Sequence, residues 1–345
     1  MDSSDKGLSH PNKAGEKVRV GVIGVGRMGR LHLVKYLELP SCEVVGFFDP
    51  DSATRQLVQA EYGVRSFETL QEILFEADAV TIAAPTRTHY ELGRRALEAG
   101  VHVLMEKPIT RAVSEASELV HIASTKGLVL LAGFIERFRF TRLASNIDIS
   151  SPIYIEATRF ATAPGREADV DVVMDLMIHD IDLILSLNQN EPHQISAWGV
   201  SVTGGLCDVA GASLEFPDGM VAQLRASRVA LQRKREIRVF RSNRYHVFDL
   251  QGNEVCEVVW TAKKGPQLTH TKGEAADPLL DQCSHFVSSV IGDNKTLSDR
   301  SAGLRSLRTA LLVSEQVSKR MRGTYSKDAK VGHHLKMEYR WEHKI

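Results

Sequence analysis

Three side chains in this sequence have the types and the spacing that proton transfer at a hydroxyl group requires. Lys107 follows the apolar run Val101–Met105, which places its ammonium at the carboxyl end of a strand, where open α/β sheets bind ligands. Asp175 and His179 are four residues apart and would share one face of a helix. A histidine beside a carboxylate can accept a hydroxyl proton as hydride leaves the carbon. The sequence therefore predicts a site suited to oxidising an alcohol.

Each of these residues also has a structural interpretation. Most lysines are exposed, and the turn Glu106-Lys107-Pro108 could serve only to fix the backbone. A buried aspartate and histidine could satisfy each other's hydrogen bonds without any chemical role. Asp182, three residues beyond His179, would lie on the same helical face. From the residues alone, the chemical and the structural interpretations both stay open.

A glycine-rich segment indicates a ligand more directly. Gly24, Gly26 and Gly29 form the pattern G-x-G-x-x-G directly after an apolar run and at the start of a helical stretch. Gly24 would permit a tight turn, Gly26 the approach of a pyrophosphate, and Gly29 close packing of helix on strand. The free N–H groups at the helix start, near Arg27 and Met28, would bind phosphate oxygens. The segment predicts a dinucleotide site, with a purely structural glycine turn as the alternative.

Asp49 indicates which dinucleotide would bind. It closes the second predicted strand, twenty residues beyond Gly29, where a carboxylate accepts hydrogen bonds from the ribose hydroxyls. A carboxylate there would repel a 2′-phosphate, so we expect NAD rather than NADP. Asp49 could instead cap the following helix. Pro85 and His89, after the fourth strand, are further candidates for lining the cofactor, although His89 could equally serve only to start a helix.

Hydrophobic patterning predicts the elements that position these residues. From Val18, short β-branched runs alternate with amphipathic stretches, which is typical of βα units around a parallel sheet. After about Phe134 the runs alternate more like antiparallel strands. The expected strands are Val18–Ile23, Val44–Phe48, Ala79–Ala83, Val101–Leu104, Leu128–Leu131, Ile153–Ala161, Gln194–Val202, Ala212–Phe216, Met220–Ala226 and Glu236–Phe240. The expected helices include Met28–Leu37, Thr88–Ala99, Ser114–Lys126, Val173–Leu187, Pro278–Ile291 and Ala302–Met321.

This pattern divides the chain into two domains of the α/β class, in keeping with its 345 residues. The expected parts are a disordered leader over residues 1–17, a dinucleotide-binding domain over 18–134, a substrate-binding and oligomerisation domain over 135–325, and a tail over 326–345.

Composition limits the partners and the compartment. The 43 basic and 43 acidic residues cancel, so no net field would attract nucleic acid or an anionic membrane. The four cysteines are widely separated, which predicts neither a metal site nor a disulfide framework and fits a reducing cytoplasm. No apolar run approaches the ~18 residues of a membrane span. We therefore expect a soluble cytoplasmic protein that binds a small molecule.

Taken together, these motifs resemble the glucose–fructose oxidoreductase, inositol dehydrogenase and rhizopine-catabolism (Gfo/Idh/MocA) family, from Val18 to about Arg322. The resemblance implies a Rossmann domain joined to an α/β domain with a large, open, mainly antiparallel sheet. It also implies homodimers or homotetramers formed through that sheet. For the site it implies His179 as base, Lys107 polarising the reacting oxygen, Asp175 tuning both, and Glu106 beside the nicotinamide.

One departure from the family pattern narrows the resemblance. The glycine pair that usually precedes the aspartate is replaced by the segment Asp171–Met174, as in the branch that contains UDP-N-acetylglucosamine 3-dehydrogenases. This branch implies oxidation of a ring hydroxyl of a UDP-sugar. Arg159 and Arg166 could then bind a diphosphate or carboxylate, or could be ordinary surface residues. An inositol or free-sugar dehydrogenase and a non-catalytic NAD-binding sensor remain alternatives.

Overall fold

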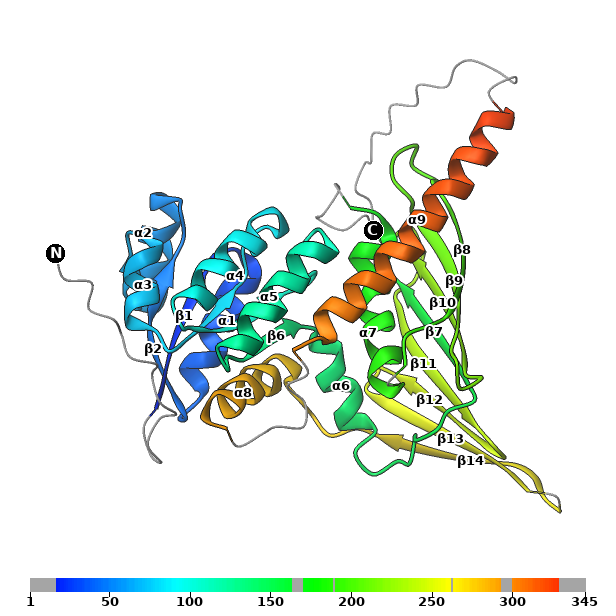
Figure 1. The fold of residues 1–345 in the computed structure, drawn as a ribbon. Coiled ribbons are helices and arrows are strands. Elements are labelled where there is room, and N and C mark those ends of the chain that lie inside the picture. Colours follow the sequence, from blue (N-terminus) through cyan, green and yellow to red (C-terminus); the bar gives the residue numbers. More distant parts are fainter. Residues whose placement is uncertain (1–16, 163–169, 189, 262, 293–299, 329–345) are drawn as a thin grey trace, which may run out of the picture.

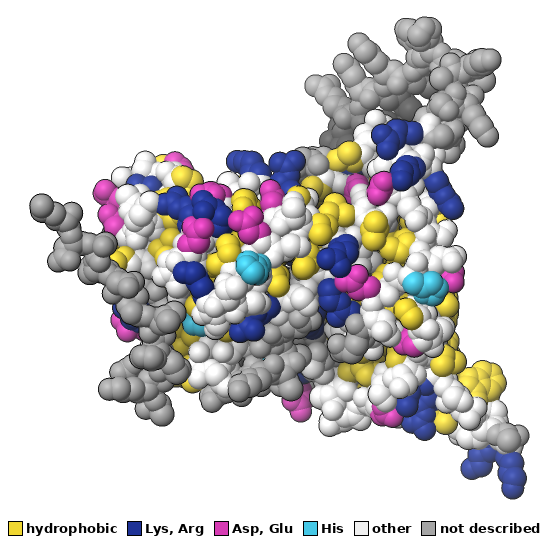
Figure 2. Space-filling view, in the orientation of Figure 1, with side chains coloured by type: hydrophobic (Ala, Val, Ile, Leu, Met, Phe, Trp, Pro, Cys, Tyr) yellow, Lys and Arg dark blue, Asp and Glu magenta, His cyan; other side chains and the backbone are white. Residues whose placement is uncertain are grey.

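The computed structural model describes the chain except for residues 1–16, 163–169, 189, 262, 293–299 and 329–345 (Figure 1). Nearly all of the predicted leader, most of the predicted tail and Arg166 lie outside the described residues. Among the described helices, none is both long enough and apolar enough to cross a membrane. On the face in Figure 2, basic and acidic side chains are interspersed rather than gathered by sign.

The first sheet is parallel and has six strands in the order β3-β2-β1-β4-β5-β6. Its strands are β1 (Val18–Ile23), β2 (Cys42–Phe48), β3 (Ser66–Phe67), β4 (Ala79–Ile82), β5 (His102–Glu106) and β6 (Leu130–Gly133). The five strands expected from the apolar runs are confirmed, because a sheet covered on both faces demands apolar residues on both faces. The order reverses between β1 and β4, which opens a crevice at the carboxyl ends of these strands.

Helices cover both faces of this sheet (Figure 1). They are α1 (Arg27–Glu38), α2 (Ser52–Tyr62), α3 (Leu70–Glu76), α4 (His89–Glu98) and α5 (Val113–Thr125), with a short 3₁₀ turn, η1 (Thr86–Thr88). Local capping fixes where several of them begin. Thr69 and Glu72 form a capping box at the start of α3, and the Asp51 side chain accepts the Thr54 N–H at the start of α2.

The second sheet has eight strands in the order β14-β13-β12-β11-β7-β10-β9-β8. They are β7 (Tyr154–Phe160), β8 (Gln194–Val200), β9 (Val209–Glu215), β10 (Val221–Ser227), β11 (Lys234–Arg241), β12 (Arg244–Asp249), β13 (Glu254–Thr261) and β14 (Gly265–Lys272). Only β7 and β10 pair in parallel, so the expected mainly antiparallel sheet is confirmed. The sequence did not predict β12, β13 and β14, which carry many polar and exposed residues.

One face of this sheet packs against helices, and the other is open (Figure 1). The covering helices are α6 (Ile135–Leu143), α7 (Ile178–Leu187) and α9 (Ala302–Asp328), and a π-helical turn, η2 (Val173–Met177), leads into α7. The expected helix Val173–Leu187 is thus a π turn followed by an α-helix. The open face gives the sheet its alternation of buried and exposed residues, which is why its strands could be told from those of the first sheet.

The chain returns to the first sheet near its end. Helix α8 (Pro278–Ile291), predicted to belong to the second domain, packs against both α6 and α1. Its residues Cys283, Phe286 and Val287 are buried in one cluster with Val18 and Val20 of β1. The C-terminal part of the chain therefore helps to build the core beneath the crevice of the first sheet.

Candidate functional site

The three glycines of the loop after β1 have the separate roles expected of a pyrophosphate cradle. Gly24 has a φ of +83°, and a Cβ there would lie 2.9 Å from the Ala83 carbonyl oxygen. A Cβ on Gly29 would collide with the carbonyl oxygen of Gly24. A Cβ on Gly26 would meet no atom within 4 Å, so only open space lies beside it. The first and third glycines shape the turn, and the second leaves room for a ligand.

The start of α1 is suited to bind an anion. Gly26 is its N-cap residue, no side chain within the described ranges caps its N–H groups, and its first turn contains no acidic residue. Free N–H groups and the positive end of the helix dipole therefore face the space beside Gly26. These residues fit the pyrophosphate of NAD.

Asp49 lies at the end of β2 and next to this loop. Its carboxylate accepts the Val25 N–H and the Asp51 N–H, both at 3.0 Å. The cap of α2 is Asp51, so the alternative that Asp49 serves only as that cap does not describe the geometry. Asp49 is partly exposed, so its carboxylate can accept further hydrogen bonds from a ligand.

Lys107, which follows β5 of the first sheet, contacts Asp175 of η2, which covers the second sheet. The Lys107 Nζ donates to the backbone carbonyl of Asp175 at 3.0 Å and lies 3.5 Å from the Asp175 Oδ1. Both side chains are mostly buried, with exposed fractions of 15% and 13%. The exposed-lysine interpretation therefore does not apply to Lys107. Its ammonium is held at the carboxyl end of β5, as the sequence predicts.

His179 lies in the first turn of α7, with its ring edge-on to Phe134 at 6.0 Å. Its Nδ1 is buried and has no hydrogen-bond partner among the described residues. Burial lowers the pKa of His179 well below its ordinary value, and the nearby charges of Lys107, Arg159 and Arg235 lower it further. The His179 ring is therefore unprotonated at neutral pH.

The expected pairing of this histidine with a carboxylate is not what the structure shows. In the described part of the chain, no hydrogen bond joins Asp175 to His179, because the Asp175 carboxylate lies toward Lys107. Asp182 does not join the site either. It is fully buried and accepts hydrogen bonds from Arg137 of α6 and Ser306 of α9, so it links helices.

Glu106 connects the site to a buried histidine that sequence reasoning missed. The Glu106 Oε1 lies 2.7 Å from the His32 Nε2, and its Oε2 accepts the Lys107 N–H at 3.2 Å. His32 is fully buried on α1, and its Nδ1 lies 3.5 Å from the Cys283 Sγ of α8. His32 therefore fixes the carboxylate that precedes Lys107. The sequence signal that could have revealed His32 is its position on α1, three residues after Gly29.

Of the two cofactor candidates that follow β4, His89 differs from expectation and Pro85 does not. His89 is buried at the start of α4, and its ring nitrogens lie 2.9 Å and 2.8 Å from the carbonyl oxygens of Pro108 and Ala84. Neither nitrogen is free for a cofactor, so His89 joins the loops after β4 and β5. Pro85 is exposed and precedes η1, where it remains available to a ligand.

Arg159 is not a surface arginine and is unsuited to direct contact with a diphosphate. It is 3% exposed and donates to both carboxylate oxygens of Asp180 at 2.7–3.1 Å. It also lies 3.6 Å from the Glu136 Oε2. The predicted substrate-binding role is corrected for this reason, since two carboxylates already engage the guanidinium. Glu136 and its other partner, Arg235, carry no motif in the sequence that would have revealed them.

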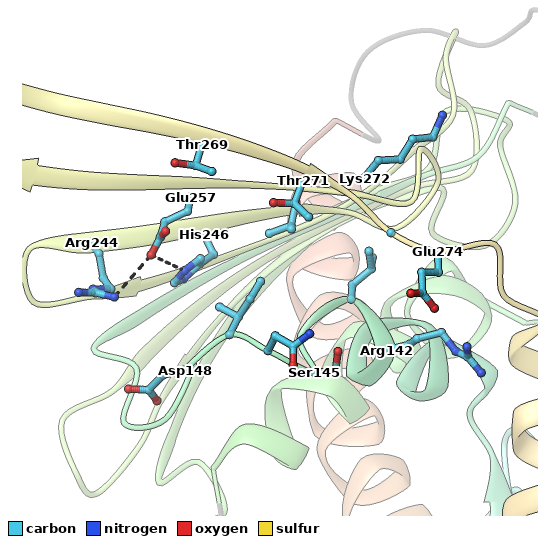
Figure 3. A pocket seen from close by; sticks show the side chains of 15 residues that line it. Arg142, Ser145, Asp148, Arg244, His246, Glu257, Thr269, Thr271, Lys272 and Glu274 are labelled. Carbon is cyan, nitrogen blue, oxygen red and sulfur yellow. Dashed lines mark hydrogen bonds and ion pairs between the residues drawn. The ribbon is translucent and has the colours of Figure 1, made fainter.

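A separate cavity of about 660 Å³ lies between β12–β14 and the segment that follows α6 (Figure 3). There the Glu257 carboxylate lies 3.5 Å from the Arg244 Nη1 and 3.2 Å from the His246 Nε2. None of Lys107, Asp175 and His179 lines this cavity. In the described ranges, no group of three or more His, Cys, Asp or Glu side chains could hold a metal ion.

Comparison with protein families gives the site its context. Residues 18–134 match the model of an oxidoreductase family with an NAD-binding Rossmann fold, Gfo/Idh/MocA. Residues 155–248 match the model of the C-terminal domain of the same family. The chain belongs to this family. It is therefore an NAD-dependent oxidoreductase that acts on CH–OH groups of small molecules.

Individual relatives narrow the comparison. The chain is 36% identical over 305 residues to the UDP-N-acetylglucosamine 3-dehydrogenase of Acidithiobacillus ferrooxidans, covering 86% of this chain and 96% of that protein. A solved structure of that enzyme superposes on this chain with a TM-score of 0.83 at 35% sequence identity. The superposition covers 88% of this chain and 99% of that one. The NAD-dependent scyllo-inositol 2-dehydrogenase of Bacillus subtilis is 29% identical over 233 residues, covering 62% of this chain and 68% of that protein.

Proposed function

We propose that this enzyme oxidises a ring hydroxyl of a UDP-sugar to a ketone, the 3-hydroxyl of a sugar such as UDP-N-acetylglucosamine. The observation that carries the proposal is the likeness to the Acidithiobacillus ferrooxidans enzyme, which extends over 96% of that enzyme's length. The likeness to the inositol dehydrogenase of Bacillus subtilis is lower and covers 68% of that protein.

In this proposal the residues around β5 and α7 divide the chemistry. Bound NAD supplies the acceptor for the hydride. Lys107 donates a hydrogen bond to the reacting oxygen, where its positive charge stabilises the negative charge that develops. His179 accepts the hydroxyl proton at a ring nitrogen, and its Nδ1 has no hydrogen-bond partner among the described residues. A positioned base of this kind accelerates a reaction by about 10²–10⁴-fold.

Two further residues keep Lys107 in place. The backbone carbonyl and the carboxylate of Asp175 both engage the Lys107 ammonium, so its direction is fixed before substrate binds. Glu106, held by His32, fixes the backbone at Lys107 and would lie beside the nicotinamide. The low pKa of His179 keeps the base unprotonated at neutral pH, which proton acceptance requires.

The proposal extends to the assembly and the compartment of the enzyme. Exposed apolar residues on three strands of the second sheet, Trp198, Trp260 and Leu268, support self-association into a homodimer or homotetramer. All four cysteines are free, which supports a reducing cytoplasm. Sedimentation of the purified chain would test the first of these, since a monomer would exclude it.

The non-catalytic sensor is not supported, because the family and the relatives named above are enzymes. The alternative that remains is oxidation of a free sugar or inositol. A panel of UDP-N-acetylglucosamine, N-acetylglucosamine and myo-inositol, with NADH absorbance as the readout, separates the two. The proposal predicts turnover of the UDP-sugar and a kcat/KM at least tenfold lower for the free sugar. Equal use of the free compounds would contradict it.

A further inference from the structure

Two arginines pair with one buried carboxylate, that of Glu136, and a third arginine lies on the same helix as this carboxylate. Arg159 and Arg235 are directly paired across β7 and β11. The Glu136 carboxylate of α6 lies between them, 3.6 Å from the Arg159 Nη2 and 3.0 Å from the Arg235 Nη1. Arg139, one turn further along α6, donates to the Leu250 carbonyl at 2.7 Å, and Leu250 in turn bonds to the backbone of Arg235. These contacts join the arginines into one cluster.

The cluster carries more positive than negative charge. Asp180 and Glu136 balance two of the three arginines, and Arg139 makes no ion pair within the described residues. The Arg139 Nε is also buried without a hydrogen-bond partner in the described part of the chain. Desolvation and the neighbouring cations Arg159, Arg139 and Arg233 lower the pKa of Arg235, although Glu136 acts in the opposite direction. A bound anion would relieve this excess of positive charge.

The side chains of the cluster differ in their exposure to solvent. The side chains of Arg159 and Glu136 are each only 4% exposed, whereas that of Arg235 is 42% exposed. Arg159 therefore supports the cluster from within, whereas the Arg235 side chain is partly accessible to solvent. Arg159, the strand neighbour of Arg235, is ion-paired with Asp180. Asp180 follows His179 directly in the chain, so the cluster lies near the proposed base.

We propose that Arg235, assisted by Arg139, binds the diphosphate of the substrate. A planar guanidinium can donate two parallel hydrogen bonds to phosphate oxygens, and Glu136 holds that of Arg235 in one orientation. The inference rests on the proposed function, because it assumes a substrate that carries a nucleoside diphosphate. It gives the enzyme a reason to prefer a UDP-sugar over the same sugar without its nucleotide.

The cavity in Figure 3 provides a matched comparison. Arg244 resembles Arg235 in its surroundings, since it is 44% exposed and lies 3.5 Å from a carboxylate, that of Glu257. Arg244 begins β12, whereas the other end of this strand pairs with Glu236, which follows Arg235. Arg244 and Arg235 therefore lie at opposite ends of the pair formed by β11 and β12. Substituting Arg244 removes a similar charge from a similar ion pair but should leave the diphosphate unaffected.

The test measures binding of UDP and of inorganic pyrophosphate by calorimetry in saturating NAD, using wild type, Arg235→Met, Arg139→Met and Arg244→Met. Loss of a charge-assisted contact should weaken both ligands about tenfold or more for Arg235→Met, and less for Arg139→Met. Arg244→Met should bind like wild type. In turnover of UDP-N-acetylglucosamine, Arg235→Met should raise KM at least tenfold and change kcat less than threefold.

The outcomes separate this inference from the proposed function. Equal dissociation constants for wild type and Arg235→Met would overturn the anion site, as would a loss confined to Arg244→Met. A wild type that oxidises no UDP-sugar would contradict the proposed function, and the pyrophosphate titration would still decide the anion site. Arg235→Lys guards against misfolding, because it keeps the ion pair with Glu136 but loses the forked hydrogen bonds. It should bind pyrophosphate with intermediate affinity, and affinity equal to that of Arg235→Met would count against the inference.

Discussion

The Lys107 ammonium at the end of β5 is anchored to Asp175 of η2, 3.0 Å from its carbonyl oxygen and 3.5 Å from its Oδ1. A residue of the dinucleotide-binding sheet is thereby fixed by an element that covers the other sheet. The reacting oxygen would lie where these two parts of the chain meet. The geometry of the site therefore depends on how the two sheets are placed relative to each other.

Removing the Asp175 carboxylate should slow the reaction without affecting the cofactor. In Asp175→Asn the backbone contact to Lys107 remains, but the ammonium loses its charged partner. We expect kcat to fall about tenfold, the value of one charge-assisted contact, with the dissociation constant of NAD unchanged. Fluorescence titration and steady-state kinetics measure the two quantities. Asp78→Asn, which breaks the surface pair with Arg19, is the control and should leave kcat unaltered.

The pH dependence of kcat/KM should reveal how the cations around His179 lower its pKa. Because Lys107 disfavours the protonated ring, replacing it with Met should raise the pKa of His179. A base with a higher pKa loses activity at a higher pH, so the acidic limb of kcat/KM should shift toward neutral pH. NMR titration of the ring gives the same pKa independently of turnover. A limb that stays in place or moves to lower pH would show that His179 is not the base.

Two neighbouring glycines should respond to alanine in opposite ways. At Gly29 the new methyl group collides with the Gly24 carbonyl, so Gly29→Ala should lower the melting temperature of the protein strongly. At Gly26 the methyl group enters open space, so Gly26→Ala should keep the melting temperature within a few degrees and weaken NAD binding. Thermal unfolding and NAD titration of both variants check this. Unchanged NAD affinity in Gly26→Ala would place the pyrophosphate elsewhere.

Acid should destabilise the protein through His102. Burial lowers the pKa of His102 to about 4, and its Nδ1 accepts the Val129 N–H at 2.9 Å, which requires an unprotonated nitrogen. The unfolded chain binds this proton from about pH 6.5 downward, so stability is lost as pH falls from there. Between pH 7 and pH 5 His102 should account for a loss of about 2 kcal/mol.

Urea unfolding of His102→Asn at both pH values isolates this contribution. The Asn side-chain oxygen can accept the Val129 N–H at any pH, so the variant should lose about 2 kcal/mol less than wild type on acidification. His121→Asn, at an exposed position of α5, should behave like wild type. Identical pH dependence in wild type and His102→Asn would contradict the assignment.

The first sheet could be predicted well because its signals are local. Apolar runs such as those of β1 and β4 have few alternatives to a buried strand, and the glycine loop specifies the turn between β1 and α1. The later strands β12 to β14 escaped prediction, since half-exposed strands with polar residues resemble loops in a single sequence. The return of α8 to the first sheet also follows from tertiary packing that no local pattern encodes.

In the site, too, the residues with a local signal could be predicted and those defined by tertiary contacts could not. Lys107 stands out because it follows a strand, whereas the importance of Arg235 depends on its meeting Glu136 from a helix 99 positions away. Spacing put Asp175 and His179 on one face, but tertiary contacts turned the carboxylate toward Lys107. Arg159 shows the converse, since the sequence presents a possible ligand contact and the fold buries it against Asp180.

Hydride transfer from carbon 3 is tested most directly by oxidising UDP-N-acetylglucosamine that carries deuterium at carbon 3, with NAD in excess and NADH absorbance as the readout. Under single-turnover conditions, we expect slower NADH formation than with the undeuterated sugar and transfer of the deuterium to the cofactor. Deuterium at any other ring carbon should leave the rate unchanged. Formation of NADH without transfer of deuterium from carbon 3, or no NADH at all, would contradict hydride transfer from carbon 3.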